Sequence, residues 1–470
     1  MIPLRLSEIG QITGGRVHPG REASAADPLV NGPVVTDSRE AAAGSLYIAR
    51  IGEAMDGHQF VAAARAQGAV AALTSRPVTD LPCVVVEDVQ AAFISLARAL
   101  VDRSPRTTVV GITGSSGKTS TKDLLSSVLG HHGETVATVG SLNSEVGVPL
   151  TVCRITPSTA FLVIEMGSRG IGHIAYLTAI APPRIGVVLN VGTAHMGEFG
   201  TREAIGTAKA ELVQCLPANG FAVLNADDPI VAGMASETHA HVIQVGRSAG
   251  ATVRAVEISL DAQACASFTL VTDQGEAPVA LGLHGEHHVA NALAVAAVAL
   301  AVGMPLQTVA MALGEARPQS RWRMEVHQRA DGVTIINDAY NANPDSMRAA
   351  LETLALMGQG RRTWAVLGEM RELGPESVAE HDSVGRHAAN LNLSRLVAVG
   401  QGTQPIDTHA RQAGSSTTES TWVADTDVAY DLLRQSLAAG DIVLLKSSHD
   451  AGLRLLGDRL LDTASVEAHP

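Results

Sequence analysis

The chain has 470 residues, 46% of them hydrophobic and 17% charged, and its formal net charge is -13. This composition permits large apolar cores and argues against a disordered chain. The acidic excess argues against a general nucleic-acid binder, which needs a basic face, but leaves room for a nucleotide. Neither a signal peptide nor a run of about 18 apolar residues is found. We therefore expect a cytoplasmic protein without a membrane span or nucleic-acid partner, and we take it to be a monomer.

Three regions follow one another along the chain, at residues 1–104, 105–319 and 320–470. Helical segments are expected at residues 61–68, from Lys118 and from His287. Short apolar strands are expected between the helices, because each is bounded by turn residues. In chain order they lie at residues 82–88, 107–113, 160–166, 184–191, 221–226, 333–338, 363–369, 395–400 and 441–447. Apolar strands that alternate with helices predict parallel sheets covered on both faces.

The strongest motif is a strand, a glycine-rich turn and a helix at residues 110–120. Such a turn points backbone N–H groups at phosphates, and the helix N-terminus adds partial positive charge. Lys118 can reach the outer phosphates, and the Thr119 hydroxyl can ligate Mg²⁺. Ile112 stands where the general P-loop has its first glycine. The alternative, a glycine-rich turn with a chance lysine, is weakened by the strand and helix on either side. The predicted phosphate contacts are Gly114, Ser115, Ser116, Gly117, Lys118, Thr119 and Ser120.

This loop resembles the ATP loop of the Mur ligase family and of folylpolyglutamate synthetase. Further segments match the family in chain order, over nearly the whole chain. They lie at residues 36–39, 56–60, 141–151, 165–167, 190–200, 208–211, 284–294, 321–325, 337–344 and 368–374. The resemblance implies an α/β fold of three domains. These are a smaller N-terminal domain that binds a UDP-sugar, a central ATP-binding domain with a P-loop-type parallel sheet, and a mobile, Rossmann-like C-terminal domain.

Within the family, residues 195–200, 340–344 and 368–374 are similar to the branch that adds a dipeptide. That likeness implies UDP-N-acetylmuramoyl tripeptide and D-alanyl-D-alanine as substrates, with ATP and two Mg²⁺ ions. Two departures are visible. Ser144 replaces a frequent second Asn, and His449 stands where the family often has an Arg that could hold the acceptor carboxylate. A paralogue with another amine substrate therefore stays open, and the third residue of the peptide is not determined.

The resemblance also implies the chemistry. The substrate carboxylate attacks the γ-phosphate of ATP and forms an acyl phosphate, with Lys118, Glu165, His195 and Lys209 as catalytic residues. Thr119, Glu165, His195 and a carbamylated Lys209 are the expected metal ligands. Glu165 follows a buried strand, where a carboxylate needs a partner. Other interpretations are a solvated Glu165, a structural His195, and an exposed Lys209 paired with nearby glutamates.

The remaining predicted site residues come from the matched segments. The residues expected to contact ATP, besides those of the loop, are Asn291, Arg321, Asp338, Asn341 and Asn343. The residues expected to bind the other substrates are Asp37, Ser38, Arg39, Asp56, His58, Asn143, Ser144 and Lys446. For Asn341 and Asn343 the alternative is an Asn-rich turn that ends at Pro344. A P-loop ATPase that acts as a switch is the rival from another class of protein, and a separate substrate domain argues against it.

Overall fold

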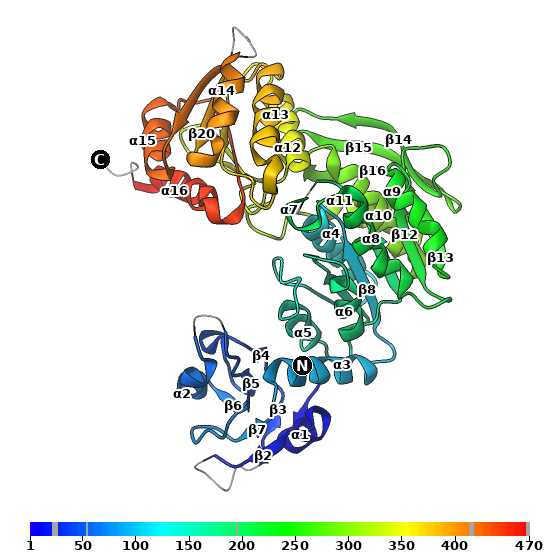
Figure 1. The fold of residues 1–470 in the computed structure, drawn as a ribbon. Coiled ribbons are helices and arrows are strands. Elements are labelled where there is room, and N and C mark those ends of the chain that lie inside the picture. The colour runs from blue at the N-terminus through cyan, green and yellow to red at the C-terminus, as the bar shows by residue number, and fades with distance from the viewer. Residues whose placement is uncertain (21–26, 53–54, 194–195, 413–417, 467–470) are drawn as a thin grey trace.

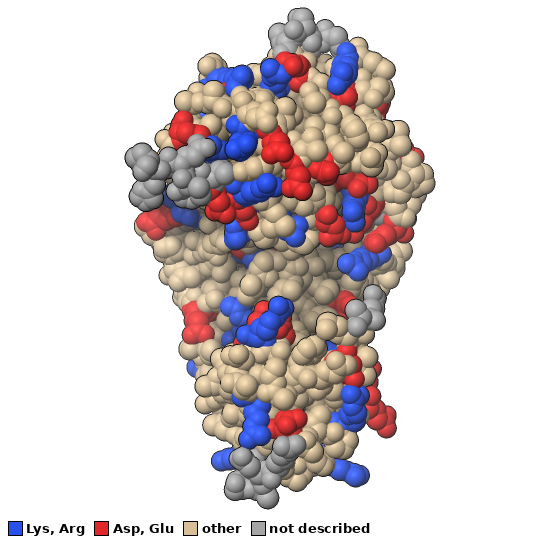
Figure 2. Space-filling view, turned by 90° about the vertical axis from the view of Figure 1, so that its left-hand side faces the viewer, with Lys and Arg blue, Asp and Glu red and all other residues tan. Residues whose placement is uncertain are grey.

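The computed structural model describes residues 1–20, 27–52, 55–193, 196–412 and 418–466, with side chains described up to residue 462. It contains three α/β domains in sequence order, each built on its own sheet (Figure 1). Among the described residues, no helix combines the length and the apolar character that a membrane crossing requires. Figure 2 shows Lys and Arg interspersed with Asp and Glu on the face that it presents.

The N-terminal domain has a five-stranded sheet in the order β2-β7-β6-β5-β4, in which only the β2–β7 pair is antiparallel. Strands β1 and β3 form a separate antiparallel pair. The strands are β1 (Leu4–Arg5), β2 (Arg16–His18), β3 (Leu29–Val30), β4 (Val34–Val35), β5 (Ser45–Ile48), β6 (Ala69–Thr74) and β7 (Cys83–Val85). The helices are α1 (Leu6–Thr13), α2 (Val61–Ala66) and α3 (Val89–Asp102). Helix α2 packs on one face of the sheet, and α1 and α3 pack on the other.

The central domain is built on a nine-stranded sheet in the order β16-β15-β14-β13-β12-β11-β8-β10-β9. Helices α5, α6 and α8 cover one face, and α4, α10 and α11 cover the other. The strands are β8 (Thr108–Thr113), β9 (Thr135–Ala137), β10 (Phe161–Glu165), β11 (Ile185–Val188), β12 (Phe221–Asn225), β13 (His241–Gly246), β14 (Val253–Leu260), β15 (Cys265–Thr272) and β16 (Gly275–His284). The helices are α4 (Lys118–Gly130), α5 (Gly147–Val152), α6 (His173–Ile180), α7 (Met196–Phe199), α8 (Arg202–Gln214), α9 (Pro229–Gly233), α10 (His287–Ala301) and α11 (Leu306–Glu315).

The sequence suggested that this sheet is parallel throughout, and that expectation is wrong for one of its edges. Strands β14, β15 and β16 pair antiparallel and form an extension at one edge. Buried and exposed residues alternate along β16, so only one face of the extension packs on the core. An antiparallel sheet can leave its other face in water, whereas a parallel sheet is usually covered on both sides.

The C-terminal domain has a six-stranded sheet in the order β17-β18-β22-β19-β20-β21, parallel except for the edge strand β17. Helices α12, α13 and α14 cover one face, and α15 and α16 cover the other. The strands are β17 (Glu325–Gln328), β18 (Thr334–Asn337), β19 (Thr363–Leu367), β20 (Arg395–Val399), β21 (Glu419–Val423) and β22 (Ile442–Lys446). The helices are α12 (Pro344–Met357), α13 (Ser377–Asn390), α14 (Gln404–Gln412), α15 (Thr426–Ser436) and α16 (Leu453–Val466).

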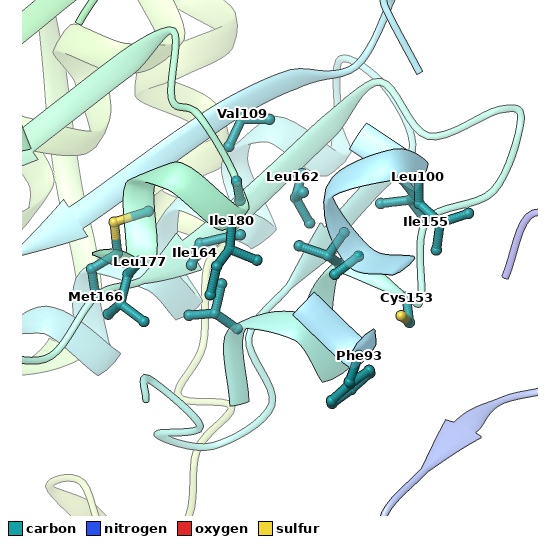
Figure 3. Close-up of a cluster of buried hydrophobic side chains, with 14 of the residues drawn as sticks. Phe93, Leu100, Val109, Cys153, Ile155, Leu162, Ile164, Met166, Leu177 and Ile180 are labelled. Atoms are coloured by element: carbon teal, nitrogen blue, oxygen red, sulfur yellow. The ribbon is translucent and has the colours of Figure 1, made fainter. Parts of the chain in front are cut away.

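The first two domains share one apolar core. Phe93 and Leu100 of α3 lie beside Cys153 and Ile155, which follow α5, and this cluster continues to Leu162 in the central sheet (Figure 3). The buried apolar clusters of the C-terminal domain take only Ala264 from outside that domain. The described contacts between the C-terminal and central domains are otherwise mainly polar, so we infer that the C-terminal domain is the more independent body.

Candidate active site

A cavity with a volume of about 1240 Å³ lies between the central and C-terminal domains. Its walls are the glycine-rich turn before α4, the ends of β10 and β11, one side of α10, and the loops after β18, β19 and β22. These loops follow the carboxyl ends of parallel strands, which is where open α/β sheets bind ligands. The cavity is therefore assembled from segments more than 300 residues apart in sequence.

The glycine-rich turn has the geometry of a phosphate loop. Gly117 adopts φ +80°, and a Cβ atom there would come within 2.8 Å of Asn291 Oδ1, so glycine is required at this position. The next residue, Lys118, begins the 13-residue helix α4. Its ammonium group donates to the Gly114 carbonyl at 2.8 Å, and burial lowers its pKa. The turn therefore presents a helix N-terminus and one lysine to the cavity, an arrangement that suits polyphosphate.

Glu165 ends β10 and is 1% exposed. Its carboxylate accepts hydrogen bonds from Thr119 Oγ1 at 2.8 Å, Asn143 Nδ2 at 2.7 Å and Ser141 Oγ at 3.2 Å. The solvated alternative for Glu165 is therefore wrong. A hydroxyl beside a carboxylate on the cavity wall is a hard-oxygen pair that fits Mg²⁺. Within the described part of the chain, no group of three or more His, Cys, Asp or Glu side chains is arranged so that it could hold a metal ion, and His195 lies outside that part.

Lys209 lies in α8 and is 5% exposed. Burial and the nearby charge of Lys118 lower the pKa of Lys209 to about 7. Glu211 is also buried, and its carboxylate accepts the backbone N–H groups of Gly172 at 2.5 Å and Ala175 at 2.9 Å. The interpretation of Lys209 as an exposed, ion-paired lysine is thus wrong. Lys209 does not line the cavity itself, but lies near the loop lysine.

The C-terminal domain contributes a buried ion pair to the cavity. Lys446 Nζ lies 2.6 Å from Asp338 Oδ2 and donates to the Asn341 carbonyl at 3.1 Å. The other Asp338 oxygen accepts the Met324 N–H at 3.1 Å. Asp338 and Lys446 therefore satisfy each other, and their pairing ties the ends of β18 and β22 together.

Asn343 has two roles in the structure. Its side chain caps α12 by accepting the Ser346 N–H at 2.9 Å, as expected for Asn at a helix start. Its Nδ2 atom also lies 3.4 Å from the Ser115 carbonyl in the phosphate loop. The Asn-rich segment thus is a turn, and it also contacts the loop of the neighbouring domain. Asn341 lines the cavity, as do Ser144 and Asn291.

The structure does not place Arg321 in the cavity. Arg321 is 62% exposed, lies 3.0 Å from Asp458 and stacks over the Trp322 ring. Arg323 lines the cavity instead: its Nη2 donates to Thr119 Oγ1 at 3.1 Å, and its guanidinium lies over the Tyr340 ring. Arg323 therefore replaces Arg321 among the residues that we expect to contact ATP, and it also bonds the C-terminal domain to the phosphate loop.

The two arginines provide a matched test. Arg323→Ala is expected to lower kcat/KM for ATP by about tenfold to a hundredfold, the effect of losing a charge-assisted hydrogen bond. Arg321→Ala should change it by less than about twofold, because an exposed ion pair contributes little. Steady-state ADP release measured on both variants checks this. A larger loss in Arg321→Ala would return the contact to Arg321.

The residues predicted to hold the nucleotide-sugar lie in the N-terminal domain, outside this cavity. Asp37 accepts the Arg39 N–H at 2.9 Å and pairs with its guanidinium, which lowers the Asp37 pKa to about 2. Asp56 pairs with Arg76 at 2.6 Å and with His58 Nδ1 at 2.6 Å. These bonds hold the loops together. Ser38 is buried in the turn that it forms with Asp37 and Arg39. Substrate binding by this group stays a prediction.

Several cavity residues were not among the predicted site residues. Arg323 and Tyr340 lie inside motifs that had been matched, so the motifs were found but not these members of them. Ser141 lies two residues before the predicted Asn143. Arg371 and Asp450 follow β19 and β22, and charged residues at the ends of parallel strands were the signal that could have indicated them.

Known protein families match the chain in three consecutive parts. The Mur ligase family catalytic domain matches residues 33–107, the Mur ligase middle domain matches residues 112–299, and the Mur ligase glutamate ligase domain matches residues 322–449. Together they span all three sheets.

Individual relatives agree with these matches. The chain is 47% identical to the UDP-N-acetylmuramoyl-tripeptide--D-alanyl-D-alanine ligase of Mycobacterium bovis, over 98% of each chain. It is 37% identical to the ligase of the same name from Escherichia coli, over 87% of this chain and 88% of the relative. The crystal structure of MurF from Acinetobacter baumannii superposes with a TM-score of 0.85 at 32% identity, covering 98% and 99% of the two chains. MurF from Thermotoga maritima in complex with ADP gives a TM-score of 0.79 at 27% identity, covering 93% and 99%. The predicted three-domain α/β fold is confirmed, and the chain belongs to the Mur ligase family of ATP-dependent, amide-forming ligases.

Proposed function

We propose that the protein joins D-alanyl-D-alanine to UDP-N-acetylmuramoyl tripeptide, with cleavage of ATP, in peptidoglycan precursor synthesis. The observation that carries this proposal is the single cavity shared by the phosphate loop and the C-terminal loops, bridged from Arg323 to Thr119. The names of full-length relatives supply the substrates. We further propose that it works in the cytoplasm as a monomer.

The proposed reaction has two steps. The tripeptide carboxylate attacks the γ-phosphorus of ATP, which forms an acyl phosphate and releases ADP. The dipeptide amine then attacks the acyl carbon and loses a proton, the bond from that carbon to the phosphate oxygen breaks, and inorganic phosphate leaves. Lys118 and the N–H groups of the loop stabilise charge on the transferring phosphoryl group. Arg323 adds a cation from the other domain, so both domains must be in place before transfer.

Thr119 and Glu165 are the residues proposed to hold Mg²⁺. Their oxygens lie 2.8 Å apart on the cavity wall, next to Lys118. Bound there, the ion would neutralise phosphate charge. We also propose that Lys209 is carbamylated and, with His195, serves a second ion. The burial of Lys209 and its lowered pKa support carbamylation, because only a neutral amine takes up CO₂.

The three regions carry separate roles in this proposal. Residues 1–104 bind the nucleotide-sugar, with Asp37, Arg39 and His58 as candidate contacts. Residues 105–319 bind the phosphates, and residues 320–470 bind the rest of ATP and the dipeptide. The apolar core shared by the first two regions supports a constant distance between the nucleotide-sugar and the phosphate loop.

Release of ADP in the presence of different substrates tests the proposed function. With ATP and the nucleotide-linked tripeptide, D-alanyl-D-alanine should stimulate ADP release far more than any single amino acid does. Omitting either the tripeptide or the dipeptide should leave only background release. Rapid hydrolysis without either substrate would instead indicate an ATPase switch and overturn the proposal.

A second candidate is a ligase for another amine, and one observation favours keeping it. His449 occupies the position where the family often has an arginine, and its ring packs edge-on against Tyr340 in the cavity wall. A preference for a single amino acid in the same panel of acceptors would support this alternative over the dipeptide ligase.

A further inference from the structure

The acceptor in the proposed reaction carries a carboxylate at the end opposite to its reacting amine. Two extended residues span about 7 Å, so this carboxylate lies well away from the acyl carbon. A carboxylate held in a cavity needs a cationic or hydrogen-bonding partner. His449 lines the cavity, but a guanidinium offers the paired N–H donors that hold a carboxylate best.

Five Lys and Arg side chains line the cavity within the described part of the chain: Lys118, Arg169, Arg323, Arg371 and Lys446. Lys118 belongs to the phosphate loop, and Arg323 is bonded to Thr119 at its edge. Lys446 is buried against Asp338. Arg169 follows β10, four residues after Glu165, and so belongs to the central domain and not to the C-terminal domain that is proposed to bind the dipeptide. Arg371 is the cation that remains for the acceptor.

Arg371 is well placed in the C-terminal domain. It follows β19, which pairs with β22, and its backbone N–H donates to Ser448 Oγ at 2.9 Å. This bond joins the loop after β19 to the loop after β22, and it fixes the backbone from which the Arg371 side chain extends. The side chain itself is 50% exposed, so its guanidinium is accessible to a ligand.

The existing partners of Arg371 can give way to a ligand. Its Nη1 lies 3.2 Å from Asp450 Oδ2, and its Nε lies 3.8 Å from Glu369 Oε2. Asp450 is 66% exposed, and exposed ion pairs contribute little stability. A guanidinium has five N–H donors, and a carboxylate can take two of them in parallel. An incoming carboxylate can thus displace Asp450 at small cost.

We propose that Arg371 binds the carboxylate of the acceptor dipeptide. The proposal rests on the proposed function, since it assumes an acceptor with a free carboxylate. Arg371 would therefore be a residue that determines acceptor specificity, separate from the groups that act on phosphate.

The test compares D-alanyl-D-alanine with D-alanyl-D-alaninamide, which lacks the negative charge. With ATP and nucleotide-linked tripeptide saturating, the unaltered protein should use the amide much less well. Arg371→Gln should raise KM for the dipeptide by about tenfold to a hundredfold and bring the two acceptors close together. KM for ATP should change by less than about twofold. Arg371→Lys keeps the charge but loses the paired N–H donors of the guanidinium. Its KM for the dipeptide should lie between the values of the unaltered protein and of Arg371→Gln.

Arg386→Gln is the matched control, because Arg386 lies on α13 of the same domain, outside the cavity, and pairs only with Asp382 among the bonds described for it. It should behave like the unaltered protein. If Arg371→Gln still discriminates against the amide as strongly, or if the unaltered protein never does, Arg371 does not bind the carboxylate. If the unaltered protein uses no dipeptide at all, the proposed function itself fails.

Discussion

Replacing Lys118 with alanine is expected to lower kcat/KM for ligation by at least about a hundredfold while the protein stays folded. The ammonium group lies at the start of α4, where it can stabilise charge on the transferring phosphoryl group, and losing one such group costs about that much. Folding should not suffer, because burial already disfavours the charged lysine and lowers its pKa. ADP release and thermal unfolding measure the two effects separately.

Lys122, one turn further along the same helix, is the matched control. It is buried in an ion pair with Asp123, which also accepts the Ser320 N–H at 3.1 Å, and it does not line the cavity. Breaking a buried pair leaves an uncompensated charge, so Lys122→Ala should lower the free energy of unfolding by about 3–5 kcal/mol. Turnover per folded molecule should be retained. A Lys118→Ala protein with near-native turnover would contradict the phosphate-loop assignment.

Local signals were sufficient for the phosphate loop. The apolar strand, Gly117 and the helix that begins at Lys118 are all determined by residues within one short segment, and the structure has each of them. The buried parallel strands were found for the same reason, since each is a short apolar run bounded by turns. Long apolar helices such as α10 were also recognisable from their own sequence.

The antiparallel extension could have been predicted but was not. Residues of β16 alternate between buried and exposed, and Gly275 allows the turn that precedes it, with φ +118°. Strict alternation is the signal of a strand with one solvated face. The expectation of a parallel sheet came from neighbouring strands and was extended too far along the chain.

The choice between Arg321 and Arg323 could not be made from sequence. Trp322 and Met324 both adopt left-handed backbone conformations, with φ 58° and 49°. These two residues turn the chain so that one arginine meets Asp458 and the other meets Thr119. Left-handed conformations of large residues are uncommon and depend on surrounding contacts, such as the Met324 N–H bond to Asp338. Such long-range contacts are not visible in a motif.

The placement of Lys209 also depended on the fold. Its sequence neighbours Glu203 and Glu211 suggested an exposed ion pair, as is common on helices. In the structure, the Glu211 carboxylate accepts backbone N–H groups at the N-terminus of α6, and Lys209 is buried. Only the packing of α6 against α8 explains this difference.

Replacing Lys209 with arginine is expected to lower ligation by at least about a hundredfold, the size of losing a group that stabilises transition-state charge. The reason is chemical: carbamylation requires a neutral amine, and a guanidinium stays protonated. In the unaltered protein the pKa of Lys209 is about 7, so at pH 8 roughly nine-tenths of the amine is neutral. Lys209→Ala should be equally inactive, and acetate should restore part of its activity by supplying carboxylate oxygens.

A second measurement does not depend on activity. After equilibration with ¹³C-bicarbonate, the unaltered protein should show a ¹³C NMR signal of a lysine carbamate that is absent from Lys209→Arg. Because the folded pKa is lowered to about 7, the amine takes up a proton as the pH falls through that value. An ammonium cannot attack CO₂, so the signal should decline between pH 8 and pH 6. Lys122→Ala should keep the signal, since its lysine lies in a separate ion pair. Full activity of Lys209→Arg together with no carbamate signal in the unaltered protein would show that Lys209 is a buried structural amine.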